Sequence, residues 1–142
     1  MIQQISVFAE NRPGKIEMVT RILARANVNI RAVTISDLGD FGVIKLLVDD
    51  PARGCDELKA VGLAARLIDV LAVRIEDKVG GLDKAARALA DKCVNVKHAC
   101  GFVVEKGKQA VFVFEVDQPA VAAKALEAAG YKPMGPEDLA KL

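Results

Sequence analysis

The sequence contains two copies of one pattern, and this internal repeat limits the fold more than any other feature. Residues 11–16 (NRPGKI) align with residues 77–82 (DKVGGL), and the same spacing aligns residues 28–30 (VNI) with residues 94–96 (VNV). A spacing two residues longer aligns residues 48–52 (VDDPA) with residues 116–120 (VDQPA). Self-similarity of this length indicates that one supersecondary unit is used twice.

The first copy predicts the order strand, helix, strand, strand, helix, strand. Alternating apolar residues predict strands at 5–9 and 28–32, and a nearly continuous apolar run predicts another at 41–48. Apolar residues at Ile16, Val19, Leu23 and Ala26 form the stripe of an amphipathic helix over 14–26. A second helix is expected from Pro51 to about residue 61, and a fourth strand at 65–69.

The second copy predicts the same order and follows without a linker. We expect strands at 70–76, 94–104 and 110–116, helices at 80–92 and 119–129, a last strand near Tyr131 and a terminal helical turn at 135–138. The fourth strand of the first copy therefore runs directly into the first strand of the second. The sequence predicts an α+β protein of two tandem ferredoxin-like βαββαβ modules, residues 1–69 and 70–142, each an antiparallel sheet with its helices on one face.

Composition excludes several classes of function. The 142 residues include 20 Lys and Arg against 19 Asp and Glu, a net charge of +1 that argues against a nucleic-acid partner and a membrane surface. Aromatic residues are few, and Phe8, Phe112 and Phe114 are assigned to the core. No apolar stretch is long enough to cross a bilayer, and the N-terminus does not resemble a secretory signal.

The three cysteines, Cys55, Cys93 and Cys100, are odd in number and form no CxxC pair. We interpret them as reduced, buried thiols, which is typical of a cytoplasmic protein.

No group of residues predicts catalysis or metal binding. His98 is the one natural general base, and no nucleophile or paired-carboxylate motif accompanies it. Cys93, His98 and Cys100 lack an evident fourth metal ligand, and Asp50 before Pro51 is ordinary chemistry for the start of a helix. We therefore expect no catalytic residue, no metal and no cofactor.

The turn after the first strand recurs in both copies. Gly14 and Gly80 allow a sharp turn that leaves peptide N–H groups uncovered at the start of a helix, where a carboxylate can bind. Asn11 or Asp77 can accept a hydrogen bond from an ammonium group, so the pattern fits an α-amino acid. A tight turn without a ligand explains the same residues.

Asn29 and Asn95 also have two interpretations. Each is either an exposed polar residue of a strand or a side-chain amide that reaches the ligand across an interface between modules.

The two copies together resemble ACT domains, a family of regulatory modules. Residues 10–16 (ENRPGKI) resemble the ligand loop of that family, residues 28–30 resemble its second strand, and the resemblance covers essentially the whole chain. The chain looks like the small tandem-ACT proteins of prokaryotes that carry no attached enzyme. The resemblance implies that amino acids bind at interfaces between paired modules. The implied ligand residues are Asn11, Arg12, Pro13, Gly14, Lys15, Ile16 and Asn29 in the first copy, and Asp77, Gly80, Gly81, Leu82 and Asn95 in the second.

The second copy departs from the family pattern. Val79 replaces the proline of the loop, and Gly81 follows Gly80, so we expect a looser loop there. Arg12 and Lys78 are either partners for a ligand side chain or solvated cations.

The leading hypothesis is a non-catalytic regulatory protein that binds a small amino acid, forms a homodimer and acts on a metabolic enzyme. The alternative is a structural or regulatory subunit of an amino-acid biosynthetic enzyme that binds no metabolite. An enzyme built around His98 is the weakest of the three.

Overall fold

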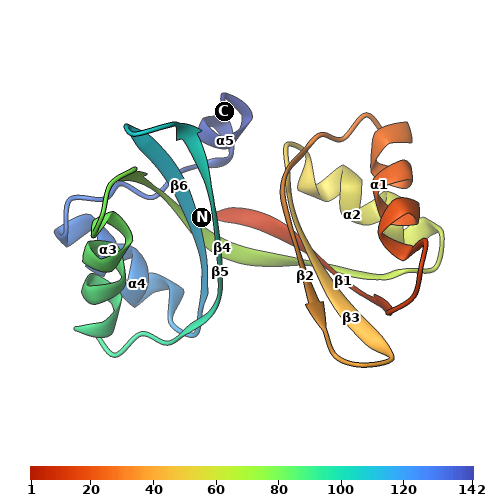
Figure 1. Cartoon of the computed structure of the whole chain (residues 1–142), viewed down its shortest axis with the longest axis horizontal. Helices are drawn as coiled ribbons and strands as arrows, with labels where there is room; N and C mark the ends of the chain where they lie inside the picture. Colours follow the sequence, from red (N-terminus) through yellow and green to blue (C-terminus); the bar gives the residue numbers. More distant parts are fainter. The chain divides into compact units, whose positions relative to one another are not determined.

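A computed structural model describes residues 1–142 and shows an α+β protein (Figure 1). The chain divides into two compact units. The first module is the unit Gln3–Ile68, and the second module is Asp69–Leu142 together with Met1–Ile2.

The sheet of the first module contains β1 (Ile2–Glu10), β2 (Ile30–Asp37) and β3 (Phe41–Val48). Strand β3 lies between the other two and is antiparallel to both. Helices α1 (Lys15–Arg25) and α2 (Pro51–Ala60) contact each other and cover one face of this sheet (Figure 1). Between sheet and helices lies an aliphatic core that includes Ile5, Val7, Leu23, Leu46 and Leu58.

The second module repeats this arrangement. Its sheet contains β4 (Ala64–Glu76), β6 (Gln109–Val116) and β5 (Val96–Glu105), with β6 antiparallel to both neighbours. Helices α3 (Gly81–Ala90) and α4 (Pro119–Ala128) contact each other, and the short helix α5 (Pro136–Ala140) ends the chain. The core includes Leu71, Val73, Leu89, Phe114 and Leu126.

The predicted fold class is confirmed, and so is the strand that runs without a break through residues 64–76. The predicted last strand near Tyr131 is wrong. Only an isolated bridge between Val73 and Pro133 forms, followed by a hydrogen bond from Met134 N to Ala72 O (2.8 Å). Pro133 has no N–H group to donate, so a regular ladder cannot continue through it.

Two predictions of buried side chains are also corrected. Cys55 is buried, and burial raises the pKa of its thiol, but Cys93 is exposed and Cys100 half-buried. Phe8 does not join the core: it is 48% exposed and stacks on Phe41, with ring centroids 5.0 Å apart. None of the helices is both long enough and apolar enough to span a bilayer.

Candidate functional site

The turn between β1 and α1 has the left-handed backbone that its glycine permits. Gly14 has a φ of 88° and stands at the N-cap of α1, where no side chain accepts a hydrogen bond from the helix. In the first hydrogen bond of the helix, Met18 N donates to Gly14 O (3.0 Å). Lys15 N donates to Arg12 O in the preceding turn (3.4 Å). The N–H groups of Ile16 and Glu17 have no acceptor within the protein, as expected for the first turn of an uncapped helix.

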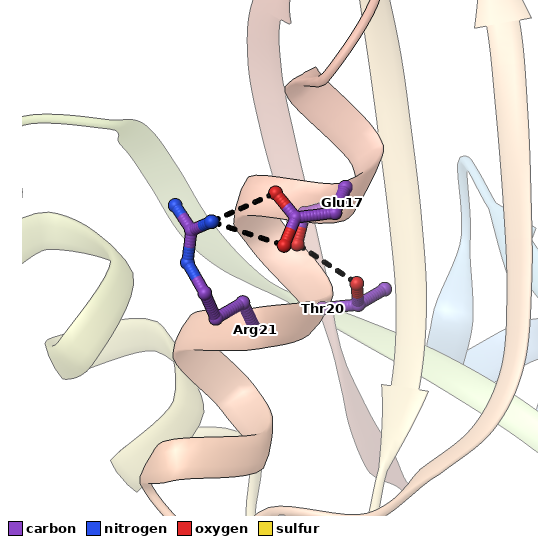
Figure 2. Close-up of polar contacts among 3 residues, drawn as sticks. All are labelled: Glu17, Thr20 and Arg21. Carbon is purple, nitrogen blue, oxygen red and sulfur yellow. Dashed lines mark hydrogen bonds and ion pairs between the residues drawn. The ribbon is translucent and has the colours of Figure 1, made fainter.

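The acidic residue of the first turn is held away from these N–H groups. Glu17 points along α1 and accepts two hydrogen bonds from Nη1 of Arg21, at 3.0 and 2.9 Å (Figure 2). The hydroxyl of Thr20 donates to the backbone carbonyl of Glu17 (2.9 Å). In α3 the corresponding pair is Asp83 with Arg87, 2.6 Å apart. The positive end of each helix is therefore available to an anion.

Asn11 connects the turn to the β2–β3 hairpin. Its side-chain Nδ2 donates to Asp37 Oδ1 and to Gly39 O, both at 2.9 Å, and its backbone N donates to Asp40 O (2.8 Å). The predicted role of Asn11 is to accept a hydrogen bond from an ammonium group. That role would use the side-chain Oδ1, whereas the hairpin contacts use Nδ2. The sequence did not predict that Asn11 would bond to this hairpin. A glycine nevertheless recurs at the same place in both hairpins, as Gly39 and Gly107.

Asp77 makes the corresponding connection in the second module. Its Oδ2 accepts from Gly107 N (2.7 Å), and its backbone N donates to Lys108 O (3.2 Å). The equivalence of Asn11 and Asp77 therefore has a structural basis within the protein itself, because each side chain fixes a strand–helix turn against a hairpin.

A small hollow of about 90 Å³ lies beside the first turn. It brings together four of the predicted ligand residues with five further residues, of which only Glu10 belongs to the segment 10–16 that resembles a ligand loop. The predicted residues are Asn11, Arg12, Lys15 and Ile16, and the others are Ala9, Glu10, Ile35, Gly42 and Ile44. Pro13 and Gly14 are exposed in the same turn. The volume is well below the roughly 300 Å³ at which pockets usually enclose a ligand, so this hollow alone covers only part of a molecule.

The loop cations have partners in the strand that precedes them. Arg12 Nε lies 3.1 Å from Glu10 Oε2, and Lys78 pairs with Glu76. The hydrogen bond from Lys78 lowers the pKa of Glu76, and the same bond raises the pKa of Lys78. All four side chains are exposed, so these pairs contribute little to stability.

Asn29 and Asn95 lie at the other end of the sheet from the turns. Asn29 N donates to Asp49 Oδ1 and Asn95 N donates to Asp117 Oδ1, both at 2.9 Å, beyond the far ends of β3 and β6. Phe41, at the start of β3, pairs with Glu10 at the end of β1, next to the turn. Val48, at the end of β3, pairs with Ile30 at the start of β2, next to Asn29. The length of β3 therefore separates the turn from Asn29 by roughly 23 Å. Within one module, therefore, neither asparagine shares a site with the turn.

The second turn is tighter than the sequence predicted. Gly80 has a φ of 82°, and Gly81 is buried so closely that an added Cβ would lie 2.4 Å from Glu76 O. The prediction of a looser loop at Gly81 is therefore wrong. Leu82 and Val79 are exposed on this turn.

The wall beside the second turn also differs. The cross-strand pair Ile35 and Ile44 of the first module corresponds to the pair Gly101 and Phe112. The ring of Phe112 lies over Gly101, where an added Cβ would be 2.5 Å from the ring. An aromatic ring thus takes the space that the side chain of Ile35 has in the first module.

His98 lies on β5, opposite Glu115 of β6. No group of three or more His, Cys, Asp or Glu side chains is placed to hold a metal ion.

Comparison with known proteins gives a family and a set of similar structures. The family model described as an ACT domain pair matches residues 1–142. None of the curated proteins matches this sequence. The solved structure of protein BT0572 from Bacteroides thetaiotaomicron is similar with a TM-score of 0.90 and 27% identity, over 99% of this chain and 96% of that one. The ligand-free regulatory subunit of aspartate kinase from Thermus thermophilus has a TM-score of 0.66 and 18% identity, over 89% of this chain and 91% of that one.

Proposed function

The chain belongs to the family of ACT domain pairs, and from this premise we propose that it is a non-catalytic regulatory protein that binds a small α-amino acid at the turn of its first module. The observation that carries this proposal is that the N–H groups of Ile16 and Glu17 have no acceptor in the protein, and that Ile16 lines the 90 Å³ hollow. The regulatory subunit of aspartate kinase from Thermus thermophilus, which is similar in fold, is consistent with a regulatory role.

The two charged groups of an amino acid have separate partners in this turn. The carboxylate accepts from the N–H groups of Ile16 and Glu17, where the helix also contributes partial positive charge. The ammonium group donates to Oδ1 of Asn11 and to the carboxylate of Glu10, both of which line the hollow. The side chain of the ligand contacts Ile35, and the small volume favours a small amino acid.

A second module has to cover this ligand, because the hollow is too small to enclose it. Ile35 is 57% exposed and its neighbour Val33 46% exposed on the edge strand β2, which leaves apolar surface beside the hollow. We propose that this surface pairs with a module of a second copy, so that the ligand favours the paired state. A ligand can regulate only through such a difference in its affinity for two arrangements.

Titration calorimetry against the twenty common amino acids at millimolar concentration tests the proposal. An added Cβ at Gly14 meets no atom within 4 Å, so the β-carbon of Gly14→Asp or Gly14→Asn meets no obstacle. Asn and Asp are also the residues that best tolerate a left-handed backbone. Gly14→Asp places a negative charge beside the seat of the carboxylate and is expected to weaken binding at least tenfold relative to Gly14→Asn.

Two results would contradict the proposal. One is the absence of heat with all twenty amino acids. The other is equal affinity in the Asp and Asn variants, which would place the ligand elsewhere.

The alternative function, a subunit that holds an enzyme without binding a metabolite, has one observation in its favour. The stacked pair Phe8 and Phe41 is about half exposed, which is unusual for large aromatic side chains without a partner. This alternative predicts that the partner enzyme binds Gly14→Asp as tightly as the wild-type protein. If the Gly14→Asp variant no longer bound the partner enzyme, this alternative would be excluded.

A further inference from the structure

A pocket of about 280 Å³ in the second module is lined by three cations. Arg74 and Lys78 come from the end of β4 and the turn after it, and Lys84 comes from α3. The far wall is Tyr131, and the Nζ of Lys84 lies 5.5 Å from the centre of its ring. The pocket is close to the lower end of the range of ligand sites, about 300 Å³.

The three cations are opposed by one carboxylate in the pocket. Glu76 pairs with Lys78 and stays ionised at neutral pH, because that lysine lowers its pKa. Arg74 donates through Nη1 to the neutral side chain of Gln109 (2.7 Å), which holds the guanidinium in place and leaves its other donors for a ligand. The pocket therefore carries an excess of positive charge, and concave walls concentrate the resulting field.

The first module has a pocket at the same place, but with different chemistry. That pocket, of about 240 Å³, includes Phe8 and Leu63, at the positions that Arg74 and Tyr131 occupy in the second module. In the first module, Met18 occupies the position that corresponds to Lys84. Three of the positions that differ around this pocket add a cation or a hydroxyl group in the second copy, whereas a fourth, Lys15 against Gly81, removes a cation.

We propose that this pocket of the second module binds a small organic anion with two negative charges, of the dicarboxylate or phosphate type. Arg74 binds one anionic group through its planar fork, and the ammonium groups of Lys84 and Lys78 contact the other. The phenol of Tyr131 supplies a hydrogen bond at the wall. The site uses no residue of the first module and is independent of the amino-acid site proposed above.

Calorimetry at low ionic strength tests the site with two probes, succinate and inorganic phosphate. We expect saturable binding of at least one probe, with one molecule per chain. Lys84→Met and Arg74→Gln should each weaken that binding at least tenfold. Lys92→Met removes another exposed lysine, which follows the end of α3, and should leave binding of the probe unchanged.

Each outcome decides the proposal. Binding of succinate alone or phosphate alone identifies the class of anionic group. The proposal is overturned if neither probe binds at millimolar concentration, or if Lys92→Met weakens binding as much as Lys84→Met, because the effect would then be one of general charge. Gly14→Asp should keep full affinity for the probe, which separates this result from a failure at the amino-acid site.

Discussion

Cys93 has a left-handed backbone at the end of α3, with a φ of 55°, at the position where α1 is followed by Asn27 with a φ of 57°. A residue with a β-carbon that is neither Asn nor Asp is strained in this region. We therefore expect Cys93→Gly to raise the free energy of unfolding by about 1 kcal/mol, measured by urea denaturation. Asn27→Gly is the matched control and should change it much less. A Cys93→Gly protein no more stable than the wild type would contradict this account.

Single residues also show where sequence reasoning reached its limit. The equivalence of Asn11 and Asp77 was visible in the repeat, but their bonds to the two hairpins were not, because partners 26 and 30 residues away depend on strand pairing. The resemblance to ACT domains implied Asn29 as a ligand residue that reaches across an interface between modules. The parallel directions of β1 and β2 place Asn29 at the opposite end of the sheet from the turn.

At the scale of elements, the close approach of α3 to β4 depends on Gly81. An added Cβ would meet Glu76 O at 2.4 Å, and a backbone atom cannot move aside as a side chain can. Gly81→Ala should therefore lower the free energy of unfolding by about 2 kcal/mol, measured by urea denaturation. Lys15→Ala, at the equivalent position of α1, should change it by less than about 0.5 kcal/mol. Equal stability of the two variants would show that the contact is not tight.

The periodic patterns predicted the order of the helices and paired strands, since the buried positions of each element recur at its own spacing, but they placed β2 at 28–32 instead of Ile30–Asp37. They failed where tertiary packing decides. Gly54 lies inside α2, where glycine is a poor helix former, yet an added Cβ would lie 2.9 Å from Cδ1 of Ile5, so its small size allows the helices and sheet to pack. The strand expected near Tyr131 stops at one bridge because of Pro133.

For the whole molecule, the amino-acid proposal requires a second copy to cover the first turn. The amino acid identified by calorimetry should then lower the dissociation constant of the dimer at least tenfold, as coupled sites commonly do. Sedimentation velocity at low protein concentration measures this change. Ile35→Asp, on the exposed edge of β2, should remove the effect. A protein that binds the amino acid and still sediments as a monomer would contradict the paired site.

The two modules share one fold and differ around their turns. The first keeps an apolar wall at Ile35 and Ile44, whereas the second has a ring over Gly101 and a cationic pocket. The repeat made the common fold predictable from sequence. The departures at Val79 and Gly81 were visible in the sequence, but the cationic pocket was not, because it depends on which side chains the fold brings together.

We propose, above all, that the free N–H groups of Ile16 and Glu17 hold the carboxylate of an amino acid. The most direct measurement is an amide ¹H–¹⁵N spectrum recorded during titration with the amino acid that gives heat. We predict that the amide protons of Ile16 and Glu17 move downfield and saturate together with the heat, because each gains a charge-assisted hydrogen bond. Saturable binding that leaves both resonances in place would contradict the claim.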